Sequence, residues 1–407
     1  MKYAHLADLH LGAWREQKMR DLSTKAFLTA IDNCIEDQVD FILFAGDLFN
    51  TSLPAVDTLK IVTKKLKELK DNNIPLYVIA GSHDFSPSGK TMLDVLEHAG
   101  LLTNVCKGSV NPETKELHLQ FTVDKKTDTK ITGILGRRGL LDKTYYQNLY
   151  RTNLEQETGY KIFMFHTTIT EMKPVELAMI DSTPISFLPQ NFNYYAGGHI
   201  HHPTNIQLEN YGTLTYTGAL WPNSFSEVEK YGQGGYYIIN VNNNEQQVTF
   251  KPLKLLNHLH LTYNCSNKAP EVITFEIINH FNDLNCDDSL ITLRIIGTLQ
   301  QGNITNINFK EIYKHIYNKG AYFIMRNTAK VQTHLFEEVK ISPSNPQQVE
   351  NELIQEHLQQ TTIFSKEIEK DITKTLLTAL NSKKQEGETI TDFNQRIISV
   401  LQKTLQL

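Results

Sequence analysis

The sequence predicts an α/β fold built on a layered sheet, and three observations lead to this prediction. Short apolar runs alternate with amphipathic stretches up to Gly100, which is the pattern of strands with helices packed on their faces. After Cys106 the apolar runs become shorter and closer together, which indicates further strands. Most of the early runs end in an aspartate or a histidine, so polar side chains gather where strands end.

The N-terminal region is expected to contain three strand–helix units. In the first helix, Phe27, Ile31 and Ile35 recur at every fourth position and therefore share one face. The third helix stops at Gly100, a residue suited to the left-handed turn that closes a helix. The expected strands span residues 2–7, 41–45 and 76–80, and the expected helices span 18–38, 54–72 and 92–99.

Strands dominate the next region of the chain. The run Asn242-Asn243-Asn244 separates two apolar stretches and predicts a hairpin between them. The expected strands span residues 118–123, 130–135, 162–165, 192–196, 235–241 and 247–252.

A boundary near residues 256–269 precedes a shorter β-α-β pattern over 290–299, 309–318 and 321–331. The run Ser342-Pro343-Ser344-Asn345-Pro346 then supplies a helix cap and a first-turn proline for the C-terminal segment. Two apolar stripes at helical spacing predict helices with an unpartnered face, formed by Ile368, Ile372 and Leu376 and by Phe393, Ile397 and Leu401. The predicted division is 1–256, 257–341 and a helical tail at 347–407.

The composition is that of a globular protein. The chain has 407 residues, 40% of them hydrophobic and 21% charged, enough for two or three domains. Its formal net charge is −5, so binding to nucleic acid would depend on local basic patches and metal ions. The four cysteines are scattered and include no C-x-x-C pair, which favours free thiols. The absence of a signal peptide or an apolar membrane-spanning run predicts a cytoplasmic protein.

Aspartate and histidine recur just past the predicted strands, at Asp8 and His10, at Asp47, at His83 and Asp84, at His166, and at His199 and His201. Mixed carboxylate and imidazole ligands favour Mn, Fe or Zn over Ca or Mg. Two such ions can share a bridging carboxylate, for which Asp47 is the candidate, and can activate a water for attack on a phosphate. His83 is better suited to proton transfer, with Asp84 beside it to fix its tautomer and raise its pKa. Taken singly, these residues could equally be turn residues, helix caps or a core histidine.

Taken together, the motifs resemble the five-block signature of the calcineurin-like metallophosphoesterases. These blocks are Asp8-x-His10, Gly46-Asp47, Gly81-x-His83-Asp84, His166 and Gly198-His199-x-His201. The opening His5-Leu-Ala-Asp-Leu-His-Leu-Gly12 and the run Gly46-Asp47-Leu48-Phe49 resemble one branch closely. That branch contains the double-strand-break repair nucleases called SbcD in bacteria and meiotic-recombination-eleven in archaea and eukaryotes.

The resemblance implies a β-sandwich flanked by helices, the metallophosphoesterase fold, followed by a small α/β DNA-capping domain and a helical tail. It makes Asp8, His10, Asp47, His166, His199 and His201 ligands of two manganese ions, with Mg²⁺, Fe²⁺ or Zn²⁺ as alternatives. His83 becomes the catalytic histidine and Asp84 its orienting partner. The implied partners are DNA ends, a second copy of the chain, and an SMC-like coiled-coil ATPase of the SbcC type that binds the C-terminal helices. The implied setting is a prokaryotic cytoplasm, at the nucleoid.

The sequence departs from the family pattern at two positions. The third block normally has Asn before the histidine, whereas this chain has Ser82, which as a poorer oxygen donor makes at most a weak metal ligand. Asn50 replaces the usual Asp after the second block, a milder change around the ligands. His202 is expected on the surface rather than in the ligand set.

The sequence indicates residues that contact DNA less clearly than it indicates the metal ligands. Arg137 and Arg138 are candidates to meet phosphates, as are Lys125-Lys126 and the loop at 221–224. Solvated loop charge explains them equally well. For the second copy of the chain, the helices at 59–69 and 92–99 are the candidate contact surface.

The leading functional hypothesis is a manganese-dependent DNA nuclease with 3′-to-5′ exonuclease and endonuclease activity in double-strand-break repair. One alternative is a metallophosphoesterase acting on small phosphoesters, against which the extra domain and tail argue. The other alternative is a DNA-repair scaffold whose catalysis is weakened by Ser82.

Overall fold

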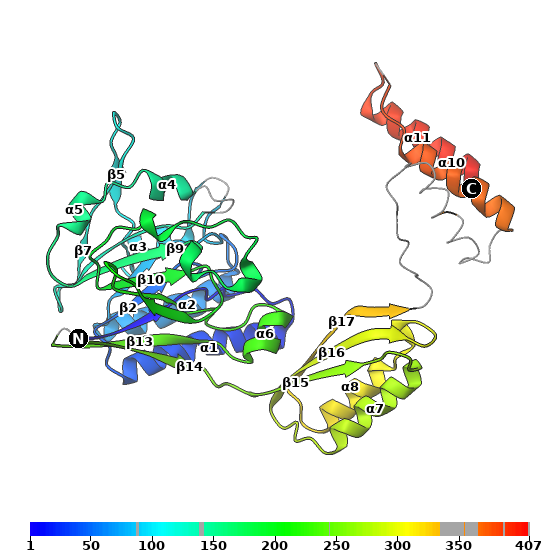
Figure 1. Ribbon diagram of the computed structural model, residues 1–407, viewed down its shortest axis with the longest axis horizontal. Coiled ribbons are helices and arrows are strands. Elements are labelled where there is room, and N and C mark those ends of the chain that lie inside the picture. Colours follow the sequence, from blue (N-terminus) through cyan, green and yellow to red (C-terminus); the bar gives the residue numbers. More distant parts are fainter. Residues whose placement is uncertain are drawn as a thin grey trace. The chain divides into compact units, whose positions relative to one another are not determined.

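The computed structural model describes residues 1–86, 89–137, 142–243, 245–333, 354, 365–385 and 387–405. The chain divides into two compact units, Met1–Thr333 and His334–Leu407. Figure 1 shows the strands and helices of both units.

The first sheet of the larger unit has six strands in the order β14-β13-β1-β2-β3-β4. Strands β1 to β4 run parallel, and β13 pairs antiparallel with both β1 and β14. The expected hairpin is thus present at one edge. The strands are β1 (Lys2–Leu6), β2 (Phe41–Ala45), β3 (Leu76–Ile79), β4 (Thr103–Asn104), β13 (Gly235–Asn242) and β14 (Glu245–Pro252).

The second sheet also has six strands, in the order β11-β12-β10-β9-β8-β7. The four inner strands are parallel and the two outer strands are antiparallel to their neighbours. The strands are β7 (Thr122–Val123), β8 (Lys130–Ile134), β9 (Lys161–His166), β10 (Tyr194–Gly198), β11 (Thr204–Gln207) and β12 (Thr213–Tyr216).

The single strand predicted over 118–123 is wrong. The chain there forms β6 (Leu117–Leu119), which pairs with β5 (Gly108–Val110), and then β7 in the second sheet. The change occurs at Gln120, whose N–H donates to the carbonyl of Lys107 before the chain crosses to the second sheet.

The two sheets pack face to face, and alternate residues of their strands enter different cores. In β2, Phe41, Leu43 and Ala45 lie between the sheets, whereas Ile42 and Phe44 face the helices. Burial on both faces explains why the central strands are apolar throughout instead of alternating. The predicted layered α/β sandwich is confirmed.

Helices cover the outer faces of the sandwich (Figure 1). Apolar side chains of α1 (Gln17–Glu36), α2 (Val56–Asp71) and α3 (Met92–His98) pack on the first sheet. The second sheet is covered by α4 (Lys143–Gln147), α5 (Thr152–Glu155) and three short 3₁₀ turns, η2 (Thr170–Met172), η3 (Val175–Leu177) and η4 (Ile185–Phe187). A short helix, α6 (Phe225–Tyr231), lies between β12 and β13.

A smaller parallel sheet, β15-β16-β17, comes after the sandwich and has its own hydrophobic core. Its first strand and first helix were not predicted from the sequence. In β15, polar residues alternate with Leu259, Leu261 and Tyr263. Helix α7 is rich in β-branched residues, whose intrinsic helix propensity is low. The elements are β15 (Asn257–Asn264), α7 (Pro270–Asn282), β16 (Ser289–Leu299), η5 (Ile304–Asn306), α8 (Phe309–Asn318) and β17 (Phe323–Thr333).

The second unit contains α10 (Lys366–Leu380) and α11 (Ile390–Leu405), which contact each other. They coincide with the two predicted amphipathic helices. The breaker run at 342–346 lies outside the described residues, and the division into domains at 256 and 341 stays a prediction. In the described part of the chain, no helix combines the length and apolarity needed to cross a bilayer.

Candidate metal centre

The predicted site residues meet because parallel strands of both sheets end at one edge of the sandwich. Asp8 and Asp47 lie just beyond β1 and β2, while His166 ends β9 and His199 follows β10. In the second sheet, Gly198 lies directly opposite His166 in the β9–β10 register. Loops at the carboxyl ends of parallel strands are where α/β sheets bind ligands.

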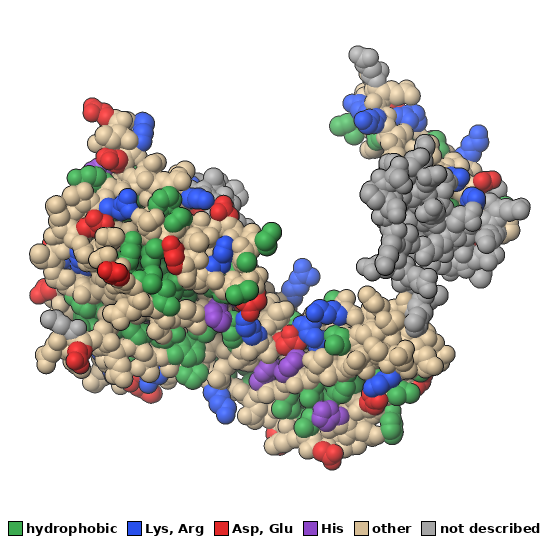
Figure 2. Space-filling model, viewed as in Figure 1, with side chains coloured by type: hydrophobic (Ala, Val, Ile, Leu, Met, Phe, Trp, Pro, Cys, Tyr) green, Lys and Arg blue, Asp and Glu red, His purple; other side chains and the backbone are tan. Residues whose placement is uncertain are grey.

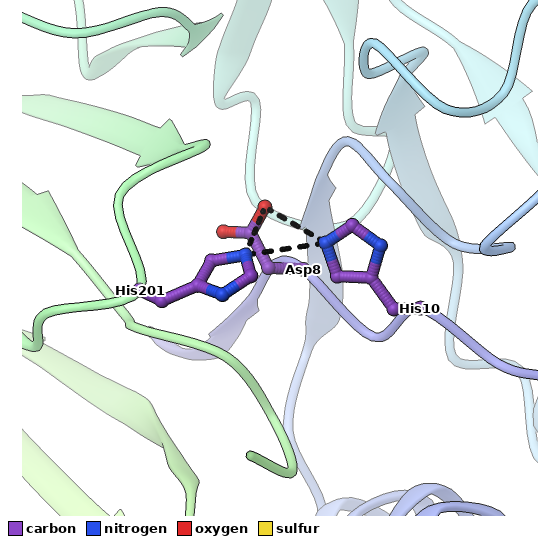
Figure 3. Close-up of side chains that lie close together, drawn as sticks. All are labelled: Asp8, His10 and His201. Atoms are coloured by element: carbon purple, nitrogen blue, oxygen red, sulfur yellow. Dashed lines mark hydrogen bonds and ion pairs between the residues drawn. The ribbon is translucent and has the colours of Figure 1, made fainter. Parts of the chain in front are cut away.

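Asp8, His10 and His201 form the first cluster, and their side chains point toward one another (Figure 3). The Nε2 atoms of His10 and His201 are 3.2 Å apart. Asp8 Oδ1 lies 3.9 Å from His10 Nε2 and 3.7 Å from His201 Nε2. Two ring nitrogens that face each other this closely need a proton or a metal ion between them.

Asp47 and His166 form the second cluster together with Asp8. Asp47 Oδ2 is 3.2 Å from His166 Nε2 and 3.6 Å from His10 Nε2. The carbonyl of Ala45 accepts a hydrogen bond from His166 Nδ1 at 2.8 Å. This bond directs the lone pair of a neutral His166 at Nε2 toward the carboxylates.

These clusters fit a metal centre. Among the described residues, the buried atom His166 Nε2 makes no hydrogen bond, although buried polar atoms are almost always paired. Asp8 and Asp47 each belong to two of the residue groups that could hold an ion. Carboxylates and imidazoles that converge in this way suit Mn, Fe or Zn.

The backbone at the site is unusual. Left-handed φ angles occur at Asp8 (52°), His10 (43°), Asp47 (54°) and His199 (86°). Non-glycine residues adopt this region rarely, and such strain clusters at functional sites. The strand ends are therefore tight turns that aim side chains back across the edge of the sheets.

The glycine of the last block leaves room for the ligands. A Cβ on Gly198 would lie 2.1 Å from the Ala45 carbonyl oxygen and 2.7 Å from His166 Nδ1. The absence of a side chain therefore lets β10 approach both β2 and the His166 ring, which explains the glycine directly before His199.

The charges of the site shift the pKa values of its residues. Burial alone would raise the pKa of Asp47, but the adjacent His166 and His10 hold it well below its usual range. Burial alone would lower the pKa of His166, but Asp47 raises it to about 9. Burial also disfavours the charged form of His201, yet Asp8 and Glu227 raise its pKa to about 10. The shifts differ within the site, since burial lowers the pKa of His10 and of His199 to about 4.

His199 lies beside these clusters. Its backbone N–H donates to both carboxylate oxygens of Asp8, over 3.0 and 2.9 Å. Its ring centroid is 5.3 Å from that of His166. Among the described residues, its ring belongs to none of the three groups that could hold an ion, whereas the side chains of the other five predicted ligands do.

His83, which was predicted to transfer a proton and not to bind metal, lies next to two of the predicted ligands. It forms a third group with His10 and Asp47, and its ring centroid is 4.8 Å from that of His10. Its Nδ1 donates to the carbonyl of Asn50 over 2.9 Å, and its backbone N–H donates to Asp47 Oδ1 over 2.7 Å. The Asn50 contact therefore sets its tautomer.

Asp84 does not orient the His83 ring as predicted. Its carboxylate accepts hydrogen bonds from the backbone N–H groups of Asp47, Phe49 and Gly81. Burial and the nearby Asp47 raise its pKa to about 7. Asp84 thus fixes the turns that carry Asp47 and His83, because its two oxygens are within reach of three amides.

Ser82 lies in the same turn. Its hydroxyl donates to Asp47 Oδ2 over 3.4 Å, so it supports a predicted ligand through a long hydrogen bond. His202 donates or accepts at Nδ1 with the Tyr231 hydroxyl over 2.7 Å, outside the three groups that could hold an ion.

Glu227 on α6 belongs to the site but was not predicted from the sequence. Its Oε1 lies 3.1 Å from His201 Nδ1, the nitrogen opposite the cluster. Ser224 caps α6 by accepting from the Glu227 N–H over 3.2 Å. The spacing Ser-x-x-Glu is typical of a helix start and was the available signal, although it does not reveal the histidine.

Among the candidates for DNA contact, Arg137 is exposed beside the site. Its guanidinium lies 5.4 Å from the ring centroid of Phe85 and 5.7 Å from that of Tyr145. Lys126 instead pairs with Asp40 at 2.7 Å, and Trp221 is buried. Arg138 lies outside the described residues.

The region that holds this site is similar to known proteins. Residues 1–203 match the family described as calcineurin-like phosphoesterase. The chain is 31% identical over 247 residues to the DNA double-strand break repair protein Mre11 of Methanococcus maripaludis, covering 58% of this chain and 61% of that protein. It is 30% identical over 240 residues to the Archaeoglobus fulgidus protein of the same name, covering 56% of this chain and 52% of that protein. It is 28% identical over 279 residues to the SbcD component of nuclease SbcCD of Staphylococcus epidermidis, covering 64% and 71%.

The chain spans between half and two thirds of the length of the two Mre11 proteins. The family match covers the strands that carry Asp8, Asp47, His166 and His201. Over residues 1–203 the chain is thus similar to the calcineurin-like phosphoesterases, and over a longer stretch it is similar to the Mre11 and SbcD proteins.

Proposed function

We propose that the chain is a manganese-dependent DNA nuclease, with 3′-to-5′ exonuclease and endonuclease activity, that acts with an SMC-like ATPase in double-strand-break repair. The observation that carries this proposal is the convergence of aspartates and histidines at one edge of the sandwich. The names of the similar proteins, which refer to break repair and to a nuclease, support the choice of DNA as substrate.

Six residues would hold two manganese ions, namely Asp8, His10, Asp47, His166, His199 and His201. Asp47 suits the bridging position because its Oδ2 faces both His10 and His166. When bound, such ions lower the pKa of a coordinated water and offset the charge of a phosphate. The chain's own contribution is to hold these side chains in place, since Asp47 is fixed at Oδ1 by the His83 N–H.

His83 would move a proton at Nε2. Because a carbonyl oxygen can only accept, the contact with Asn50 assigns the proton of the neutral ring to Nδ1. Nε2 is then the atom able to exchange a proton with a reacting group. General acid–base catalysis of this kind contributes about 10²–10⁴-fold to a rate.

Arg137 would contact the DNA backbone. Its guanidinium is exposed and lies over Phe85, next to Asp84 in the site. An arginine in this position offers a bidentate contact to a phosphate without reading the base sequence.

The test measures cleavage in Mn²⁺ and in Mg²⁺ with three substrates. These are a linear duplex labelled at its 3′ ends, a circular single strand and a p-nitrophenyl phosphodiester. We expect release of nucleotides from the 3′ ends, nicking of the circle, and little turnover of the small ester.

Two other outcomes would overturn the proposal. Turnover of the ester without DNA cleavage would identify a small-molecule phosphoesterase. Bound metal with no turnover of any substrate, in the presence of the ATPase, would identify a scaffold with weakened catalysis.

A further inference from the structure

We propose that α6 couples the small β15–β17 sheet to the metal site, with Glu227 as the positioning residue for His201. The proposal rests on the metal site of the proposed function but not on DNA as its substrate. Its central observation is that one short helix contacts a predicted metal ligand and the small sheet at the same time.

His201 depends on its neighbours for its orientation. Its side chain is 25% exposed, whereas those of Asp8 and His166 are fully buried. Packing therefore holds His201 less firmly than it holds the other two. The hydrogen bond between Nδ1 and Glu227 Oε1 compensates for this, because it fixes the ring from the side opposite to Asp8.

Glu227 is itself held at the start of α6. Its Oε2 accepts from the backbone N–H of Asn223 over 2.9 Å, and its own N–H donates to the Ser224 hydroxyl. Val228, the next residue, is buried in the core of the first sheet. The position of the Glu227 carboxylate therefore follows the position of the helix.

The small β15–β17 sheet also contacts α6, through an ion pair between Arg294 and Glu229. Arg294 of β16 donates from Nε and Nη2 to the two oxygens of Glu229, over 2.5 and 2.6 Å. The guanidinium also lies 5.3 Å from the Phe225 ring centroid. A bidentate arginine–carboxylate pair fixes both distance and direction.

The end of α6 meets the small sheet as well. Gly232 closes the helix with a φ of 67°, and a Cβ there would lie 2.7 Å from Nδ1 of His258 on β15. His260, also on β15, lies 3.6 Å from Glu229 Oε1. Figure 2 shows histidine and basic side chains gathered on this part of the small sheet.

A seven-residue helix has few hydrogen bonds of its own, so contacts at its ends determine where it lies. A displacement of the small sheet, for instance when a ligand binds it, would move Arg294 and with it Glu229 and α6. The His201 ring would then turn through its bond to Glu227. The small sheet thereby sets the affinity of the site for metal.

The test is calorimetric titration of the full chain with Mn²⁺ alone. Removal of a hydrogen-bond partner behind a metal ligand typically lowers affinity about 10–100-fold, which we expect for Glu227→Ala. Glu227→Gln, which keeps an acceptor for Nδ1–H, should recover most of the loss. Arg294→Ala and Glu229→Ala should each weaken binding about threefold to tenfold. The variant that combines Arg294→Ala with Glu229→Ala should bind Mn²⁺ no more weakly than the weaker-binding single variant. The reason is that each substitution removes the same Arg294–Glu229 contact.

The matched control is Lys230→Ala, on the same helix. Lys230 pairs with Glu176 outside the small sheet, at 2.8 Å with both side chains exposed, so its loss should leave Mn²⁺ affinity unchanged. Thermal melting of each variant separates loss of fold from loss of affinity.

Two results would overturn the inference. Wild-type affinity in folded Arg294→Ala and Glu229→Ala would show that the small sheet does not control the site. Wild-type affinity in Glu227→Ala would show that His201 needs no positioning residue. Failure of the wild-type chain to bind Mn²⁺ would instead overturn the metal centre of the proposed function.

Discussion

Asp47 is held by several partners at once. Its Oδ1 accepts from the His83 N–H and its Oδ2 from the Ser82 hydroxyl, while its own N–H donates to Asp84. Each of these contacts reduces the freedom of the carboxylate. The residue is thus positioned before a metal ion binds, which lowers the cost of binding.

His83 is the residue whose role is decided most directly by mutation. We expect His83→Ala to bind metal as the wild type does and to lose about 10²–10⁴-fold in nuclease rate, the usual size of a general acid–base contribution. Metal content is measured by elemental analysis and turnover with labelled duplex DNA. His202→Ala, outside the ligand groups, is the control and should retain both properties.

The position of His83 beside His10 and Asp47 makes the opposite result meaningful. If His83→Ala loses one of the two ions, the residue is a ligand and another group must transfer the proton.

Ser82 tests the departure from the family pattern. We expect Ser82→Asn to bind the weaker manganese ion more tightly and to raise activity at limiting Mn²⁺, because an amide oxygen is a better ligand than a hydroxyl. Calorimetric titration of both proteins measures the change. Equal affinities would indicate that a water or another side chain already completes the coordination.

At the scale of elements, secondary structure could be predicted from the sequence where the apolar pattern was clear. Strands β2 and β9 are apolar on both faces, and the residues at their ends are the predicted ligands. In β15, by contrast, one face is polar, and α7 has weak intrinsic helix preference, so both are stabilised by packing on residues distant in sequence.

Site residues held through long-range contacts were the least predictable. Glu227 reaches His201 only because α6 lies against the loop after β10, and no spacing in the sequence encodes that contact. Asp84 was expected to serve its neighbour His83, but the turn directs its carboxylate to three backbone amides instead.

Helices α2 and α3 carry the surface expected for a second copy of the chain. Val56 is 80% exposed and Val95 is 58% exposed, on helices that pack over the same core. We expect Val56→Glu combined with Val95→Glu to convert a dimer to a monomer, because charges would be buried at the contact. Light scattering coupled to size-exclusion chromatography measures the mass.

Val175→Glu is the matched control, since Val175 is 89% exposed but lies in η3. A dimer that survives the double substitution, or a wild-type monomer, would contradict this assignment.

At the scale of the whole molecule, the C-terminal helices α10 and α11 belong to a compact unit of their own. The second compact unit begins at His334. In α10 and α11, Ile368, Leu380, Ile390 and Ile398 are each more than half exposed. Covering such side chains would contribute roughly 1.5–3 kcal/mol each, which favours docking of these helices in a groove of a partner.

We expect deletion of residues 347–407 to leave a folded chain that binds metal and cleaves DNA but no longer associates with the SMC-like ATPase. Co-purification and thermal melting measure the two properties. A point variant, Ile368→Glu, should weaken association, whereas Thr375→Glu, at an exposed polar position of α10, should not. A truncated protein that still binds the ATPase and melts much lower would show that the tail belongs to the body of the protein.

The backbone conformation of the metal site also relates metal supply to the lifetime of the protein in a cell. Left-handed φ angles occur at Asp8, His10, Asp47 and His199. Each such conformation costs of order 1 kcal/mol, against a typical folding free energy of about 5–15 kcal/mol. An ion that binds only the folded chain offsets this cost by mass action. If the chain binds metal as proposed, a larger fraction of chains would therefore be open to proteases when metal is scarce. The abundance of the protein, and not only its turnover number, would then follow the manganese content of the cell.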